Sequence, residues 1–209
     1  MYVPSAFAGN DLPDLHSFME CNSFATLVTK HDDGKLIASH IPLLLVRDGS
    51  RYGQLCGHIA RANDQWRDVD GEALAIFSGP HVYVSPRWYE ADQVVPTWNY
   101  VAVHAYGPLE IISDRTEFLE LLRHTIDTFE AGVETPWTLE RSGEAVDKLL
   151  AGIVGFRIPI MRLEGKWKLS QNHSPDRQAK VIAALESQPG EDAQEIAAMM
   201  RKNLERLSG

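Results

Sequence analysis

Cysteine is scarce in this chain of 209 residues, and long apolar runs are missing. The two cysteines, Cys21 and Cys56, form no CxxC pattern. A chain of this size needs no disulfide or metal to bury a core. With no signal peptide at its start, both thiols are expected to stay reduced in the cytoplasm. No run approaches the roughly 20 apolar residues of a membrane-spanning helix, so the composition indicates a soluble protein.

Common nucleotide-binding and catalytic motifs are missing as well. The sequence holds neither GxGxxG nor GxxxxGK[ST], which excludes a dinucleotide fingerprint and a P-loop. No GxSxG elbow is present. The eight histidines are scattered, without an i,i+4 pair and without a cysteine at ligand spacing. We therefore expect no metal site.

Positive charge is in deficit, with a net charge of −9. Sequence-independent DNA binding comes from Lys and Arg neutralising phosphates. The only segment that resembles a helix-turn-helix, 176–207, carries five basic and six acidic residues. A recognition helix normally presents an excess of positive charge. Direct DNA binding is thus possible but is not supported by the charge.

The hydrophobic pattern predicts six or so strands with helices inserted and appended. Alternation predicts strands at 24–30, 36–46, 51–60, 73–79, 81–86, 94–112 and 152–165. Helical periodicity predicts a short helix after Asn10-Asp11, another opening near Asn63, an amphipathic helix capped by Asp114, and two tail helices at 176–187 and 191–207. Most strands are joined by short turns, which favours a small, imperfectly closed barrel over a βαβ sandwich. Pro42 and Pro159 lie within strand patterns, so those strands should be interrupted, bulged or at a sheet edge there.

Polar aromatic clusters recur at the predicted strand ends. The segment 94–100, "VVPTWNY", places a hydroxyl, an indole, an amide and a phenol side by side. Similar mixtures occur in 39–45, 57–66, 79–89 and 164–172. Such side chains can simply pin strand ends, but their number favours a bound planar, polar ligand.

The stretch "ARAND" at 60–64 is the best candidate for a phosphate site. A predicted strand ends at Ala60 and a helix is expected to open at Asn63, so free amides and the helix dipole would favour an anion. Arg61 could add a charge-assisted bond. Asn63 could equally serve only as a helix cap.

Long motifs in the chain resemble the FMN-binding negative transcriptional regulator (PaiB-like) family. They are "MYVPSAF", "FATLVT", "ASHIPLLL", "GHIARANDQW", "AIFSGPHVYVSPRWY", "VPTWNYVAVHAYG", "GIVGFRIPI" and "LEGKWKLSQN", from residue 1 to about 180. The resemblance implies an α+β protein with a split β-barrel related to pyridoxamine-phosphate oxidases and flavin reductases. It further implies a homodimer with FMN in the crevice between barrels. We expect the barrel to span 1–175 and a helical extension, 176–209, to pack on the barrel or the dimer partner.

The resemblance also implies the cofactor-binding residues. These are Ser39, His40, His58, Arg61, Asn63, Thr97, Trp98, Asn99, Tyr100, Lys166, Lys168 and Gln171. Trp98 would wall the ring and Asn99 would bond the pyrimidine carbonyls. The pyridoxamine-phosphate oxidases usually carry an Arg-Lys pair on the phosphate turn, where this chain reads Arg61-Ala62-Asn63. Phosphate binding must therefore use backbone donors or another residue, such as Lys166 or Lys168.

Two classes of function remain open from the sequence. The first is a flavin-binding regulatory protein, which the family name implies. The second is a flavin-dependent oxidoreductase that acts on an unknown small molecule. In such an enzyme the flavin carries the chemistry and no general base is demanded, and the sequence singles out no catalytic residue.

Overall fold

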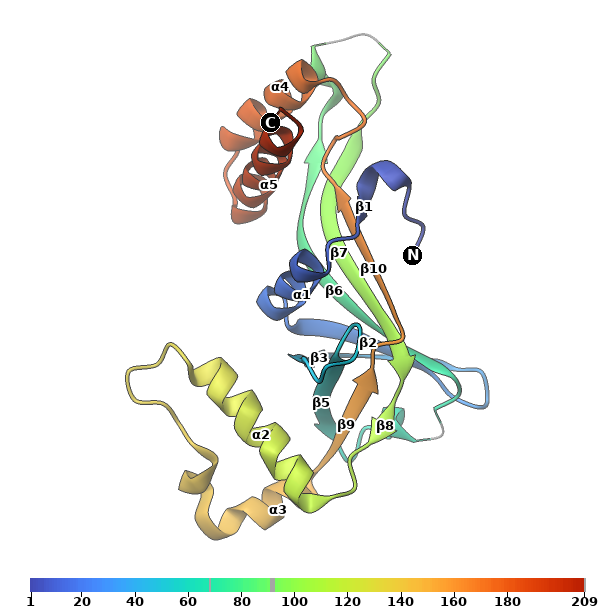
Figure 1. The fold of residues 1–209 in the computed structure, drawn as a ribbon, viewed down its shortest axis with the longest axis vertical. Coiled ribbons are helices and arrows are strands. Elements are labelled where there is room, and N and C mark those ends of the chain that lie inside the picture. The colour runs from blue at the N-terminus through green and yellow to red at the C-terminus, as the bar shows by residue number, and fades with distance from the viewer. Residues whose placement is uncertain (68, 91–92, 209) are drawn as a thin grey trace. The chain divides into compact units, whose positions relative to one another are not determined.

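The computed structural model describes residues 1–67, 69–90 and 93–208. The chain forms two compact units, and each is built from separate segments. Unit 1 comprises 1–18, 78–104 and 164–209, and unit 2 comprises 19–77 and 105–163. The predicted α+β class is confirmed, because antiparallel strands and separate helices make up both units (Figure 1).

The strands form two sheets. Their bounds are β1 (Ala8–Gly9), β2 (Phe24–Lys30), β3 (Leu36–Pro42), β4 (Leu44–Val46), β5 (Gln54–Ala60), β6 (Glu72–Val84), β7 (Thr97–Pro108), β8 (Glu110–Ile111), β9 (Ile153–Pro159) and β10 (Arg162–Lys168). The six-stranded sheet has the order β1-β10-β7-β6-β2-β3, and the four-stranded sheet has the order β4-β5-β9-β8. The structure therefore has more strands than the six or so that the hydrophobic pattern predicted.

Proline marks the places where the chain leaves one sheet for the other. β3 ends at Pro42 in the six-stranded sheet, and the chain continues as β4 in the four-stranded sheet. β9 ends at Pro159 in the four-stranded sheet, and β10 lies in the six-stranded one. The predicted interruptions at both prolines are confirmed, since proline cannot donate to a strand ladder. By contrast, Pro80 does not break β6, and the two strands predicted around it are one.

The helices differ more from their predicted positions in unit 2 than elsewhere. The α-helices are α1 (Leu12–Cys21), α2 (Arg115–Glu130), α3 (Val146–Ala151), α4 (Pro175–Glu186) and α5 (Glu191–Ser208). The 3₁₀ turns are η1 (Ser5–Phe7), η2 (Asp64–Trp66), η3 (Pro86–Tyr89) and η4 (Leu139–Ala145). η4 and α3 were not predicted, because 139–151 lacks a clear apolar period.

Unit 2 has a core between α2 and the four-stranded sheet. Asp114 caps α2 by accepting the amide hydrogen of Glu117 at 2.8 Å, as predicted. The Glu117 carboxylate accepts a hydrogen bond from Arg157 of β9 at 2.6 Å. The buried side chains of this core are Leu44, Cys56, Ile112, Phe118, Leu121, Leu122 and Leu139. Phe129 is exposed near the end of the helix and lies outside this core.

Unit 1 contains the helical tail. α4 and α5 pack on each other, and α4 also packs on η3 (Figure 1). Buried Val181, Ile182, Leu185, Ile196 and Met200 form the apolar side of this pair. The tail therefore packs within its own unit. A barrel boundary at residue 175 stays a prediction.

Candidate functional site

The residues predicted to bind the cofactor fall into two groups, one in each unit. Unit 2 holds Ser39, His40, His58, Arg61 and Asn63. Unit 1 holds Thr97, Trp98, Asn99, Tyr100, Lys166, Lys168 and Gln171.

In unit 2, Asn63 and Ser39 meet between β3 and the turn after β5. The Asn63 Nδ2 donates to Ser39 Oγ at 2.9 Å. The Asn63 Oδ1 accepts the amide hydrogen of Gln65 at 3.0 Å and so caps η2. The predicted helical start with Asn63 as its cap is confirmed, but the helix is a single 3₁₀ turn, after which Arg67 adopts an extended backbone. A single turn provides little helix dipole, so an anion here would depend on individual donors.

Gln65, which the sequence did not single out, anchors this turn. Its side chain is fully buried. Its Nε2 donates to the Leu27 carbonyl at 2.9 Å and to the Ile37 carbonyl at 3.2 Å, one on each strand of the β2–β3 hairpin. The turn that carries Asn63 is therefore fixed to the hairpin that carries Ser39.

Arg61 lies at the same turn, and part of its guanidinium already donates hydrogen bonds within the protein. Its Nε donates to the Ala151 carbonyl at 2.8 Å and its Nη2 to the Ile153 carbonyl at 2.9 Å. The side chain thus satisfies one carbonyl at the end of α3 and one at the start of β9 while remaining exposed. Its Nη1 keeps two further N–H donors. The neighbouring Asp64 carboxylate lies 3.4 Å from Arg67. The donors of Ser39, Arg61 and Asn63 fit an oxyanion such as a phosphate.

The two histidines of this group have side-chain neighbours other than Ser39 and Asn63. His40 is exposed, with its Nδ1 3.0 Å from Thr26 Oγ1 and its ring stacked on Phe24. His58 pairs with Gly155, over which the ring of Phe118 lies. Burial lowers the pKa of His58 below its ordinary value of 6.5. No described hydrogen bond joins either histidine to Ser39 or Asn63, so unit 2 brings together only part of its predicted group.

In unit 1, Lys168 is bound to the start of β7. Its Nζ donates to Thr97 Oγ1 at 2.5 Å and to the Trp98 carbonyl at 2.6 Å. Burial, with a smaller effect from the charge of Lys166, lowers the pKa of Lys168. The structure therefore brings together three of the predicted residues, Thr97, Trp98 and Lys168.

Lys166 lies among aromatic rings in the same unit. Its side chain is only 8% exposed. Its Nζ donates to the Tyr2 carbonyl at 3.2 Å and lies 5.2 Å from the centroid of the Tyr100 ring. Tyr2 was not predicted, although it lies in the quoted motif "MYVPSAF". The structure therefore places two of the predicted residues, Tyr100 and Lys166, next to each other.

Trp98 and Asn99 point to different environments. Trp98 is 53% exposed and has Tyr83 and His81 as ring neighbours. Asn99 has no exposed surface, and its Nδ2 donates to Ser170 Oγ at 3.1 Å and contacts Met200 Sδ. The Asn99 side-chain amide therefore forms its hydrogen bonds with other residues of unit 1.

Gln171 and Ser170 form the turn after β10. Gln171 Oε1 accepts the amide hydrogen of Leu169 at 2.7 Å, and its Nε2 donates to the Trp167 carbonyl at 2.5 Å. Ser170 adopts a left-handed φ of 65°, and its hydroxyl lies 3.3 Å from Tyr89 Oη. The Gln171 side chain therefore stabilises its own turn, whereas Ser170 connects the turn to Tyr89.

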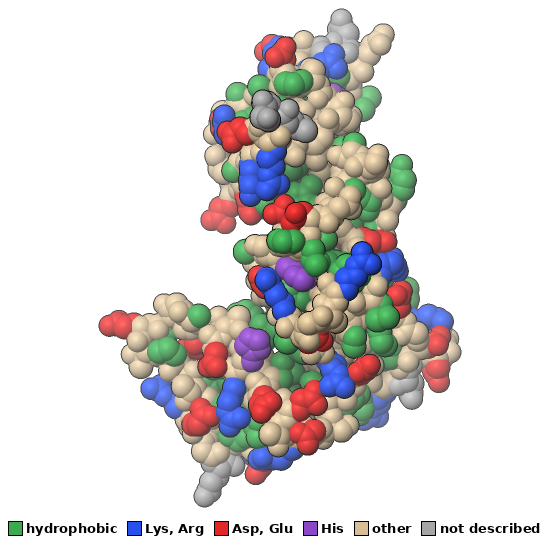
Figure 2. Space-filling view, in the orientation of Figure 1, with side chains coloured by type: hydrophobic (Ala, Val, Ile, Leu, Met, Phe, Trp, Pro, Cys, Tyr) green, Lys and Arg blue, Asp and Glu red, His purple; other side chains and the backbone are tan. Residues whose placement is uncertain are grey.

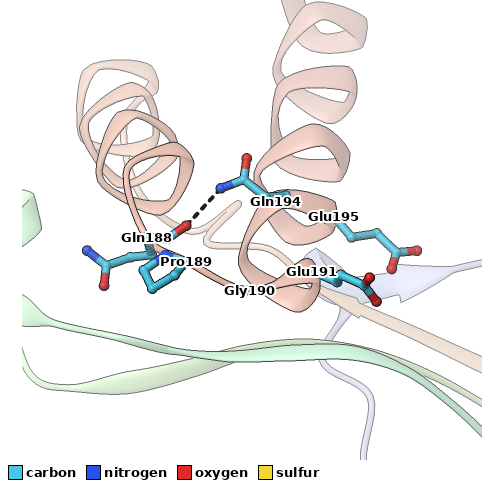
Figure 3. A pocket seen from close by; sticks show the side chains of 6 residues that line it. All are labelled: Gln188, Pro189, Gly190, Glu191, Gln194 and Glu195. Carbon is cyan, nitrogen blue, oxygen red and sulfur yellow. Dashed lines mark hydrogen bonds between the residues drawn. The ribbon is translucent and has the colours of Figure 1, made fainter.

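A surface hollow lies at the turn between α4 and α5 (Figure 3). It is lined by Gln188, Pro189, Gly190, Glu191, Gln194 and Glu195. A hydrogen bond of 2.9 Å from Gln194 Nε2 to the Gln188 carbonyl crosses the turn. The carboxylates of Glu191 and Glu195 would repel a phosphate in this hollow. None of the predicted cofactor-binding residues lines this hollow.

Within residues 1–67, 69–90 and 93–208, no group of three or more His, Cys, Asp and Glu side chains could hold a metal ion. No described helix is both long and apolar enough to cross a membrane.

Comparison with known proteins identifies relatives over the full length of the chain. Residues 1–162 match the model of a family described as "Putative FMN-binding domain". The chain is 34% identical over 209 residues to the Bacillus subtilis "Protease synthase and sporulation protein PAI 2", covering 99% of both chains.

Solved structures share the fold at much lower identity. The FAD and heme binding protein of Mycobacterium smegmatis has 17% identity and a TM-score of 0.57, over 85% of this chain and 79% of that one. The flavocytochrome Anf3 of Azotobacter vinelandii has 16% identity and a TM-score of 0.56, over 77% of this chain and 69% of that one. These likenesses confirm the predicted split β-barrel fold.

Proposed function

The chain belongs to the family described as "Putative FMN-binding domain", and from this premise we propose that it is a PaiB-like regulatory protein that binds FMN. The observation that carries the proposal is the family match over residues 1–162, a range that includes Ser39, Arg61 and Asn63. Flavins supply electron- and hydride-transfer chemistry when bound. We further propose that the protein works in the cytoplasm, where its free thiols, Cys21 and Cys56, would stay reduced.

The turn at 61–63 is our candidate for the phosphate group of the cofactor. Asn63 and Ser39 are held together by their 2.9 Å hydrogen bond, and Gln65 fixes the turn to the β2–β3 hairpin. The role of these residues is to hold the phosphate oxygens with preformed donors. A preformed site avoids part of the entropy cost of ordering side chains on binding.

The cofactor also motivates the proposed homodimer. In the split-barrel relatives that the sequence resembles, the flavin lies in a crevice between two barrels. Exposed aromatic side chains such as Trp98 and Tyr83 are suited to cover by a second copy. Light scattering should give twice the 23.4 kDa of one chain at micromolar concentration. A monomer would contradict the dimer.

Regulation by direct DNA contact through the tail is not part of the proposal. Three of the tail's cations are paired with carboxylates: Lys180 with Glu90, Arg201 with Glu186, and Arg206 with Asp14. Acidic and basic side chains are mixed on the face drawn in Figure 2. A surface of this kind offers few cations for phosphate neutralisation.

Titration of the full-length protein with FMN tests the proposal directly. Quenching of flavin fluorescence should saturate at one FMN per chain. Arg61→Ala should weaken FMN about tenfold or more and leave riboflavin nearly unchanged, because riboflavin lacks the phosphate. Arg47→Ala is the matched control, since Arg47 is an exposed arginine of unit 2 paired with Glu20.

Two outcomes would count against this assignment. If neither flavin binds, the flavin-binding function is wrong. If Arg61→Ala weakens both flavins equally, Arg61 acts only by holding the carbonyls of Ala151 and Ile153.

A further inference from the structure

Two lysines on one face of β10 have no carboxylate partner among the described residues. Lys166 and Lys168 are two residues apart, so their side chains leave the strand on the same side. Among the residues that the structure describes, no carboxylate oxygen lies within ion-pair distance of either ammonium group. Glu164, the next residue on that side, pairs with the Met1 ammonium. Two neighbouring positive charges in a partly buried position are unfavourable without a counterion.

Both ammonium groups retain hydrogen-bond donors. An ammonium carries three N–H donors. Lys166 uses one on the Tyr2 carbonyl. Lys168 uses two, on Thr97 Oγ1 and the Trp98 carbonyl. In the described part of the chain, two donors of Lys166 and one of Lys168 are left for a ligand.

Aromatic rings surround these donors. The Lys166 Nζ lies 5.8 Å from the Tyr2 ring centroid and 5.2 Å from that of Tyr100. The Lys168 Nζ lies 5.9 Å from the Phe7 ring centroid. Tyr2 and Phe7 come from the N-terminal segment, whose strand β1 pairs with β10. Rings beside ammonium donors provide apolar walls for a planar group and a fixed end for its charge.

We propose that Lys166 and Lys168, with the rings of Tyr2, Phe7 and Tyr100, bind a small molecule that carries an oxyanion on a planar ring. The oxyanion is a carboxylate or a phosphate monoester, and the molecule is a substrate or effector distinct from the flavin. All five residues belong to unit 1. The site therefore does not depend on the proposed FMN contacts of Arg61 and Asn63 in unit 2.

Calorimetric titration of the full-length protein, with and without FMN, tests this site. The probes are benzoate, phenyl phosphate, inorganic phosphate and the neutral benzyl alcohol. Benzoate and phenyl phosphate should bind more tightly than benzyl alcohol. Lys166→Gln and Lys168→Gln should each weaken both anions about tenfold or more, since each removes a charge-assisted bond.

A matched lysine and a ring substitution serve as controls. Lys180→Gln should have no effect on these probes, because Lys180 is an exposed lysine of unit 1 paired with Glu90. Tyr100→Leu should weaken benzoate about tenfold but leave inorganic phosphate unchanged, because it removes the ring and keeps both lysines. Lys168→Arg should retain anion binding. If a glutamine variant does not fold, Tyr100→Leu and Lys168→Arg still test whether the lysines and the ring bind the anion.

The flavin titration separates this site from the cofactor's own phosphate. If the lysine variants weaken FMN but not riboflavin and leave benzoate unchanged, the lysines serve the cofactor, and the proposal is overturned. Equal binding of benzoate and benzyl alcohol, or no binding of any anionic probe, also overturns it. If the lysine variants lose benzoate binding and keep their FMN affinity, the proposed oxyanion site is supported. This result supports the site even if Arg61 proves purely structural.

Discussion

Asn99 and Ser170 hydrogen-bond to each other in both directions inside unit 1. The Asn99 Nδ2 donates to Ser170 Oγ at 3.1 Å, and Ser170 Oγ lies 3.2 Å from Asn99 Oδ1 as a donor. The serine holds a left-handed φ of 65°, which costs energy in a residue with a side chain. The pair therefore joins the start of β7 to the turn after β10, at the point where Trp98 and Lys168 meet.

Asn99→Ala should destabilise the protein, because it leaves the Ser170 hydroxyl with fewer partners in a buried site. We expect the free energy of unfolding to fall by about 1–3 kcal/mol. Trp98→Ala should change it by about 0.5 kcal/mol or less, since this indole is largely exposed. Denaturant unfolding of the apo protein measures both. A parallel FMN titration tests the sequence-based prediction that both side chains line the flavin. A stable Asn99→Ala variant with weakened FMN binding would favour that prediction over a packing role.

Gly107→Ala should be strongly destabilising. A Cβ at this position would lie 1.9 Å from the Pro159 carbonyl oxygen, which belongs to the backbone and cannot rotate away. We expect a loss of about 3 kcal/mol or more, or no folded protein. Gly132→Ala is the control, because nothing lies within 4 Å of its Cβ position. Thermal melting of the two variants compares them, and equal melting temperatures would contradict the close approach of β7 to Pro159.

His58 should make stability depend on pH. Its pKa in the folded protein is lowered by burial from 6.5, so the unfolded chain binds the proton more readily. Stability therefore falls as the pH drops below 6.5. His58→Gln should reduce this fall, whereas substitution of the exposed His124 should not. Urea unfolding across this pH range measures the effect, and parallel curves for wild type and His58→Gln would rule it out.

The two thiols should differ sharply in reactivity. Cys21 is exposed, whereas burial raises the pKa of Cys56 to about 11. Because the thiolate is the reactive form, a thiol reagent at neutral pH should modify Cys21 quickly. Cys56 should react only after unfolding in denaturant. Mass spectrometry of the modified protein identifies the residue, and rapid double labelling of the native protein would contradict the burial of Cys56.

The sequence predicted features whose causes are local. Pro42 and Pro159 interrupt strands because proline lacks an amide hydrogen, and Asp114 caps α2 with its own carboxylate. Gly34 adopts a φ of 85° at the tip of the β2–β3 hairpin, where an Asp-Gly pair is typical of a tight turn. Such features depend on neighbours in the chain and can be read from it.

Features set by distant contacts were harder to predict. The single turn at Asn63 ends because Arg67 is extended and Val69 bridges to His31, a contact that no local pattern contains. The alternation of β7 shows that Trp98 and Asn99 face opposite sides, but it cannot show which side is buried. That choice depends on the contact of Asn99 with Met200, 101 residues later. For the same reason the sequence missed Gln65 and Tyr2.

The division of the chain between its units sets an order for folding during synthesis. Unit 2 has all its residues once the ribosome has passed residue 163, whereas unit 1 needs 164–209 as well as two earlier segments. Domains generally fold as soon as their own chain is available. The first and middle segments of unit 1, including β1 and the start of β7, must therefore wait without their β10 partner. The segment that begins at residue 164 therefore completes the unit that also contains residues 1–18.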